Sequence, residues 1–244
     1  MMNTNKRLLM LQIGIIGCIL YVIGDFLFAA TGKNQSAETI GLMVRVAYLE
    51  MGTWRMVASI LCGFIGTLLY YMGFHQMYQL LCIRIDGFRN EWLLKLFRAA
   101  YVTGTVAWAY VHAMFMNVAL IFKFIFQAYG DQDKAADIAN RVFYCNAAPM
   151  LAAFILCDGI LTVAVISMIW KNIIPLKSIV LKVLATVCNP LLFAGIIGNL
   201  TTLLPWPFNQ IDHGTESFGH ALVLVLGIVL LHSLEREGKI VDYA

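Results

Sequence analysis

Six long apolar stretches run through this chain, and each can cross a lipid bilayer as an α-helix. An α-helix needs about 20 residues to span the ~30 Å hydrocarbon core of a bilayer. Only helices and closed barrels satisfy their backbone hydrogen bonds in lipid, and these runs lack the alternating polarity of barrel strands. The sequence predicts an all-α membrane protein, a six-transmembrane-helix bundle with helices at about residues 8–31, 54–82, 96–128, 142–170, 178–204 and 217–234.

Composition agrees with this class. Hydrophobic residues make up 61% and charged residues 13% of the 244 residues, whereas soluble domains carry about 25% charged residues. No linker or low-complexity segment divides the chain, so residues 1–244 are predicted to form a single polytopic membrane domain. The chain carries no nucleic-acid-binding pattern, and the expected partners are membrane lipids and a small-molecule or lipid ligand. Six spans are few for a complete transporter, which favours a homodimer.

Basic residues in the loops predict the orientation. Eleven lie on the side of both termini: Lys6, Arg7, Arg84, Arg89, Lys95, Arg98, Lys171, Lys177, Lys182, Arg236 and Lys239. Five lie in the opposite loops: Lys33, Arg45, Arg55, Lys134 and Arg141. Loops rich in Lys and Arg stay in the cytoplasm. The sequence therefore predicts a multi-pass protein of the cell membrane with both termini cytoplasmic.

Residues 37–51 join the first two predicted spans and are too polar to cross the bilayer. Their apolar residues recur at steps of three and four, at Ile40, Met43, Val44, Ala47 and Met51. This spacing is typical of an amphipathic helix that lies on the membrane surface. We expect a short interfacial helix here.

A glycine pattern recurs in three of the predicted spans. Gly14, Gly17 and Gly24 in the first span match Gly63, Gly66 and Gly73 in the second, and Gly195 with Gly198 repeats part of the pattern in the fifth; the first two copies also align Tyr21 with Tyr70. Small residues at such spacing let helix backbones approach closely in lipid. The pattern indicates either packing faces or a duplicated unit.

Polar side chains gather in the outer half of the predicted bundle. Such groups are costly in the hydrocarbon core and therefore indicate function. Asp25 needs a partner, for which Arg55 and His112 are the candidates. The sequence predicts an outward-facing ligand-binding pocket built from Asp25, Arg55, His112, Asn117, Asn199, Glu216 and His220.

The start of the last span also suggests a metal site. His213, Glu216 and His220 fall on one helical face and, with Asp25 or His112, suit zinc or iron; alternatively, only His220 is buried and the other two lie in a loop and cap. Haem is disfavoured, because His220 and His232 point about 120° apart on an ideal helix. Asp158, the deepest carboxylate, suits either proton-coupled transport or a neutral hydrogen bond to Asn189 or Thr186.

Three functions therefore stay open. The first is binding or transport of a small polar or amphipathic ligand, with Asp25 and Arg55 recognising charge. The second is a metal-dependent intramembrane enzyme, hydrolase-like, that acts on a lipid or other membrane substrate. The third is a scaffolding or assembly subunit whose glycine faces pack against other helices.

Overall fold

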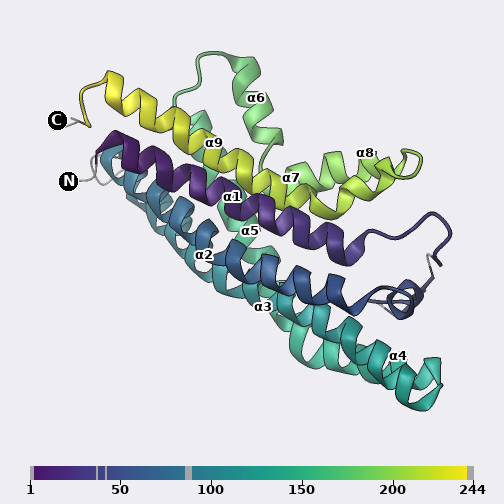
Figure 1. Ribbon diagram of the computed structural model, residues 1–244. Coiled ribbons are helices and arrows are strands. Elements are labelled where there is room, and N and C mark those ends of the chain that lie inside the picture. The colour runs from purple at the N-terminus through teal and green to yellow at the C-terminus, as the bar shows by residue number, and fades with distance from the viewer. Residues whose placement is uncertain (1–2, 37, 42, 86–89, 241–244) are drawn as a thin grey trace.

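Long helices form most of the molecule (Figure 1). The computed structural model describes residues 3–36, 38–41, 43–85 and 90–240, without the side chains of residues 211–213. Among these residues, five helices are long and apolar enough to cross a membrane: α1 (Thr4–Ala29), α2 (Thr53–Arg84), α3 (Glu91–Tyr129), the continuous helix Gln132–Trp170 and α9 (Thr215–Arg236). A sixth span exists if one bent helix pair is counted. This architecture agrees with the all-α membrane class.

Helices α1 and α2 touch backbone to backbone. A Cβ atom built on Gly14 would lie 2.5 Å from the Cα atom of Gly73, and one built on Gly17 would lie 2.6 Å from the Tyr70 nitrogen. The two copies of the glycine pattern thus pack against each other in antiparallel register. Their similarity is accounted for by this shared packing face, as expected for helices that associate in lipid.

The third and fourth spans are longer than a bilayer requires. Helix α3 has 39 residues, which is about 58 Å at 1.5 Å per residue. Gly130 ends it in the left-handed conformation, and the Asp131 side chain caps α4 (Gln132–Val142). Through a π-helical turn at Phe143–Ala147, α4 continues into α5 (Ala148–Trp170). The predicted start at residue 142 is too late, because Ala135, Ala136 and Ala139 give α4 a buried face against α3.

The prediction of an interfacial helix over residues 37–51 is wrong. Strands β1 (Thr39–Ile40) and β2 (Val44–Arg45) pair antiparallel around Gly41, whose φ of 70° favours a turn, and a 3₁₀ turn at Val46–Leu49 follows. Asn140 of α4 donates a hydrogen bond to the Ile40 carbonyl. Val44, Ala47 and Met51 are buried in a cluster with residues of α3 and α4. The apolar residues therefore face protein rather than a lipid surface.

The fifth predicted span is broken in the middle. Helix α6 (Ile179–Val187) and the segment Pro190–Thr202 meet at 79°. Asn189 has an extended backbone, as is usual before proline, and Pro190 begins α7 (Pro190–Phe193). A π-helical turn at Ala194–Gly198 leads into α8 (Asn199–Thr202). In Figure 1, α7 and α8 lie alongside α9, whereas α6 stands away from the bundle.

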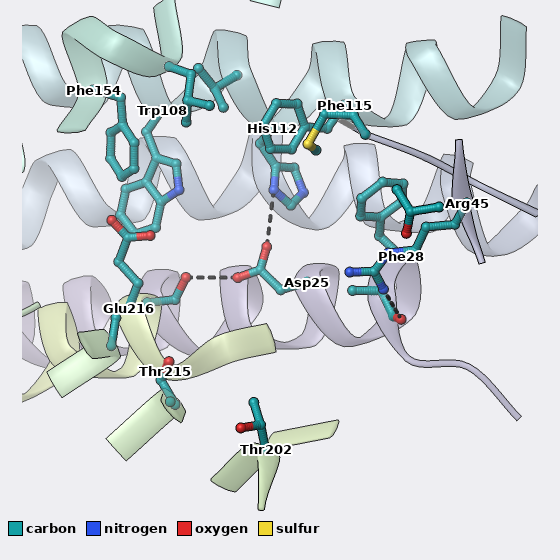
Figure 2. A pocket seen from close by; sticks show the side chains of 18 of the residues that line it. Asp25, Phe28, Arg45, Trp108, His112, Phe115, Phe154, Thr202, Thr215 and Glu216 are labelled. Carbon is teal, nitrogen blue, oxygen red and sulfur yellow. Dashed lines mark hydrogen bonds and ion pairs between the residues drawn. The ribbon is translucent and has the colours of Figure 1, made fainter. Parts of the chain in front are cut away.

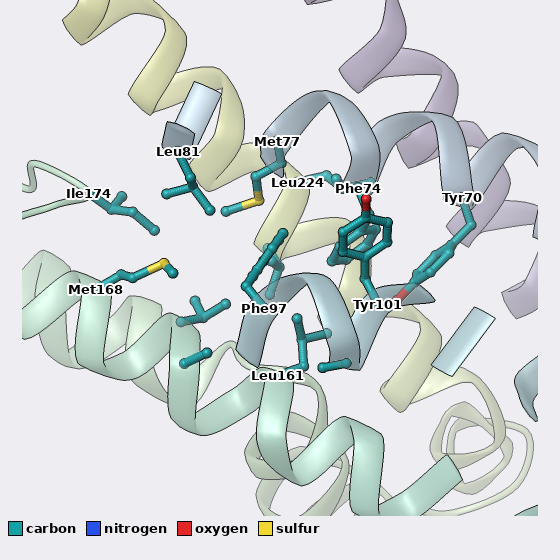
Figure 3. Packing of buried hydrophobic residues seen from close by; sticks show 14 of the residues in the cluster. Tyr70, Phe74, Met77, Leu81, Phe97, Tyr101, Leu161, Met168, Ile174 and Leu224 are labelled. Carbon is teal, nitrogen blue, oxygen red and sulfur yellow. The ribbon is translucent and has the colours of Figure 1, made fainter. Parts of the chain in front are cut away.

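An aromatic core holds the half of the bundle nearest the termini (Figure 3). Phe74 of α2 packs near Phe97 and Tyr101 of α3, with Leu161 of α5 and Leu224 of α9 in the same buried cluster. Helix α1 begins and α9 ends at this end of the bundle (Figure 1). Because both ends of the chain lie at the same end of the bundle, the structure agrees with an even number of membrane crossings. The cytoplasmic placement of both termini stays a prediction.

The α1–α2 contact generates a matched test within the glycine pattern. We expect Gly14→Ala to lower the free energy of unfolding by about 1–3 kcal/mol, because the new methyl group overlaps the α2 backbone. Gly195→Ala is the control, since nothing lies within 4 Å of a Cβ atom at that position. Thermal unfolding of the detergent-purified variants measures both. Equal stability of the two variants would contradict backbone contact at Gly14.

Candidate functional site

A cavity of about 490 Å³ opens at the end of the bundle away from the termini. Helices α1, α3, α5, α9 and the α7–α8 segment surround it, together with the β-hairpin. Aromatic rings form much of its wall, and Figure 2 labels Phe28, Trp108, Phe115 and Phe154 among them. Four residues of the predicted pocket line it: Asp25, His112, Asn199 and Glu216.

Asp25 and His112 form the polar centre of this cavity (Figure 2). The Asp25 Oδ1 atom lies 3.5 Å from His112 Nδ1. On the other side of the ring, His112 Nε2 lies 3.0 Å from the Ser59 carbonyl oxygen, which only accepts hydrogen bonds. Nε2 therefore carries hydrogen, and Nδ1 faces the carboxylate. An ion pair forms when Nδ1 is protonated as well.

Glycines of α1 and α2 make the space for this histidine. A Cβ atom on Gly63 would overlap the His112 ring, and one on Gly24 would lie 3.1 Å from Nε2. Ser59, one turn from Gly63 on α2, donates a hydrogen bond to the Gly24 carbonyl and lies 3.2 Å from the same Nε2. The glycine pattern thus packs the two helices at one end and receives His112 at the other.

Helix α9 brings two further polar groups to the site. Ser217 donates a hydrogen bond of 2.9 Å to Asp25 Oδ2. The neighbouring Glu216 carboxyl group lines the cavity beside Trp108 and Phe154 (Figure 2) and interacts electrostatically with Asp158 and Asp25. Glu216 therefore interacts with the acidic side chains of both α1 and α5.

His220 and Asp158 form a second histidine–carboxylate pair behind the cavity. Both side chains are buried, with His220 Nε2 2.8 Å from Asp158 Oδ1. His220 Nδ1 lies 3.1 Å from the Glu216 carbonyl oxygen and must donate to it. A proton is then required between Nε2 and Oδ1, because without it two acceptors would face each other at close range. Neither side chain of this pair lines the cavity, and the ring centre of Trp108, which does line it, lies 4.6 Å from that of His220.

Besides His220, two residues of the predicted pocket lie outside the cavity lining. Arg55 donates hydrogen bonds to the carbonyl oxygens of Leu27 and Ala30, at 2.9 and 2.7 Å, and so caps the carboxyl end of α1. Asn117 is exposed on α3, where its amide lies 4.0 Å from the Met114 sulfur. Neither side chain lines the cavity, and of the two partners expected for Asp25 the structure brings only His112 to it.

Several residues that line the cavity were not singled out by the sequence. Arg45 enters from the β-hairpin and donates a hydrogen bond to the Ala29 carbonyl. Tyr48 follows it, and burial raises the pKa of its phenol to about 12, so this hydroxyl stays protonated. Ser217 adjoins Glu216, but a serine in an apolar helix carries little signal.

The metal hypothesis rests on a side chain outside the described set. Within the described residues, no group of three or more His, Cys, Asp or Glu side chains is placed to hold a metal ion. The His213 side chain is not among them. Both ring nitrogens of His220 already face protein oxygens, at Asp158 and at the Glu216 carbonyl. A zinc or iron site at His213, Glu216 and His220 therefore stays a prediction that requires His220 to leave these partners.

The role of Arg55 as a cap can be measured. We expect Arg55→Gln to lower the free energy of unfolding by about 1.5–3 kcal/mol, because charged hydrogen bonds to the end of α1 are lost. Arg141→Gln is the matched control: Arg141 forms an exposed pair with Asp137 four residues away, a type of pair worth less than about 1 kcal/mol. Thermal unfolding compares them. An Arg55→Gln protein as stable as Arg141→Gln would rule out the cap.

The buried pair gives a second prediction. His220→Ala leaves the Asp158 carboxylate without its partner, which costs about 3–5 kcal/mol for a buried pair. We expect adding Asp158→Asn to recover part of that loss, because the two residues are directly coupled. His232→Ala serves as control, since its side chain is 55% exposed. Additive losses in the double variant would show that the two side chains do not interact.

Comparison with known proteins places the chain in a family. No curated protein and no solved structure matches it. A family model described as "Family of unknown function (DUF6796)" matches residues 2–233. This match covers nearly the whole chain, and the chain therefore belongs to that family.

Proposed function

We propose that this protein binds, and moves across the membrane, a small polar or amphipathic ligand in the cavity between α1, α3 and α9. The observation that carries the proposal is the Asp25 carboxylate, which reaches the cavity and is held there by His112 and Ser217. A carboxylate within a membrane-spanning helix is costly, so its presence indicates a role.

Cavity size and composition support a small amphipathic ligand. Ligand pockets usually enclose about 300–1,000 Å³, and this cavity encloses about 490 Å³. Trp108, Phe115 and Phe154 offer apolar contact, while Asp25 and Glu216 accept hydrogen bonds. We therefore expect a ligand with a ring or short chain and a hydrogen-bond donor, such as an amine, that reaches the two carboxyl groups.

Transport is supported by the broken helix and by the contact between Asp25 and His112. Substrate sites of many transporters are formed by discontinuous membrane helices, and here Ala194, Gly198 and Asn199 of the α7–α8 region line the cavity. When His112 Nδ1 is protonated, a cationic group that approaches Asp25 competes with that proton for the carboxylate. Exchange of that proton for the ligand would couple the two fluxes. The predicted orientation directs the cavity outward.

Two alternatives remain as predictions. A metal-dependent enzyme acting on a membrane substrate requires stoichiometric zinc or iron that is lost in His220→Ala, which elemental analysis of the purified protein measures. A scaffolding subunit requires copurifying partners and tolerates substitution of the cavity residues. Neither has a contact in the described residues that favours it over ligand binding.

A ligand screen tests the proposal. We expect small aromatic amines to raise the thermal unfolding temperature of the detergent-purified protein more than matched aromatic carboxylates do, because Asp25 and Glu216 accept from the amine. A ligand at 100 times its Kd adds about 2.7 kcal/mol of stability. Asp25→Asn and Glu216→Gln should each abolish the shift, and Asp137→Asn, an exposed carboxylate on α4, should retain it.

Uptake of a stabilising amine into proteoliposomes, driven by a pH gradient, then tests transport. Binding that survives both Asp25→Asn and Glu216→Gln would refute the assigned site. Binding without uptake would leave the site and refute the transport step.

A further inference from the structure

A second cavity lies between α6 and α9, at the opposite end of the bundle from the ligand site. It encloses about 380 Å³ and exists because α6 bends away from the α7–α8 segment by 79°. Leu181 and Leu184 of α6 line it together with Cys188, the residue after this helix, and Leu222, Val225 and Val229 line it from α9. The two helices thus present facing apolar walls.

Each apolar wall ends in a cation at the same end of the groove. On α9, Arg236 lies seven residues after Val229 and so shares the face of its apolar row. On the other wall, Lys177 lines the groove from the segment just before α6. Lys177 precedes the start of α6 and Arg236 is the last residue of α9. These are the only charged side chains that line the groove among the described residues.

Neighbouring charges leave both cations available. Nearby basic residues have partners: Arg84 pairs with Glu237, and Lys182 donates to Asn172 Oδ1 at 2.6 Å. Glu235 pairs with His232. Within the part of the chain that the structure describes, neither Lys177 nor Arg236 forms an ion pair, and the one hydrogen bond of the Arg236 side chain runs from Nε to the His232 carbonyl.

We propose that the groove between α6 and α9 binds an anionic phospholipid of the surrounding bilayer, with an acyl chain between the helices and the phosphate at Lys177 and Arg236. Basic pockets between membrane helices on the cytoplasmic side bind anionic headgroups, and the loop charges predict that this end is cytoplasmic. The acyl chain covers apolar walls that α6 cannot cover by itself, because the break at Pro190 directs it away from α9. This site is independent of the cavity lined by Asp25 and of the proposed function.

Native mass spectrometry of the full-length protein in detergent tests the site. The probes are phosphatidylglycerol and phosphatidylcholine with identical acyl chains. We expect one phosphatidylglycerol per chain and a preference of about 30-fold over phosphatidylcholine, since each basic residue near a headgroup contributes about fivefold. K177Q/R236Q should remove the preference, and the control K95Q/R98Q, which removes two cations of α3 at the same end, should keep it.

A second pair of variants tests the apolar walls. Val225→Trp should fill the groove and displace the lipid, whereas Val163→Trp, at an exposed position of α5, should leave it bound. Equal retention of the two lipids by the wild-type protein would overturn the anionic site. A dimer that dissociates in Val225→Trp but not in Val163→Trp would also overturn it, because the groove would then hold a second copy of the chain. Thermal unfolding confirms that each variant is folded.

Discussion

The close contact between the α1 and α2 backbones is the constraint on which the site depends. In lipid no hydrophobic force draws helices together, so they associate by packing, and glycine permits the shortest approach. Gly14 meets Gly73 at one end of the contact. At the other end, Gly24 and Gly63 leave room for the His112 ring of α3. The same glycine pattern that joins the two helices thus also leaves room for an imidazole beside Asp25.

The two histidine–carboxylate pairs follow one design. In each, the ring nitrogen remote from the carboxylate faces a backbone carbonyl oxygen, of Ser59 for His112 and of Glu216 for His220. That contact fixes one hydrogen on the remote nitrogen and directs the other nitrogen at the acid. The pairs differ in access: Asp25 lines the cavity, whereas Asp158 is buried and does not line it.

Much of the fold could be predicted from apolar length, because the thickness of a bilayer is a strong constraint. Residues 37–51 show the limit of this reasoning: their apolar spacing suits a helix, yet contact with α3 and α4 and the turn at Gly41 select a hairpin. For the site, burial cost correctly indicated that Asp25 needs a partner and named His112 among the candidates. The role of Arg55 depends on the position of the last α1 carbonyl groups relative to the start of α2. Spacing along the sequence does not determine that position.

The break at Asn189 and Pro190 connects the two halves of the molecule. Gly219 of α9 lies against Pro190, where a Cβ atom would come within 2.7 Å of the proline Cα. The adjacent residue, His220, holds Asp158. The bend is therefore fixed against the helix that also carries Glu216 and Ser217 into the cavity. On one side of this point the α7–α8 segment closes the cavity, and on the other α6 diverges and opens the groove. A continuous helix would satisfy its backbone hydrogen bonds equally well, but it would form neither this wall of the cavity nor this wall of the groove. The proline therefore determines the shape of both sites.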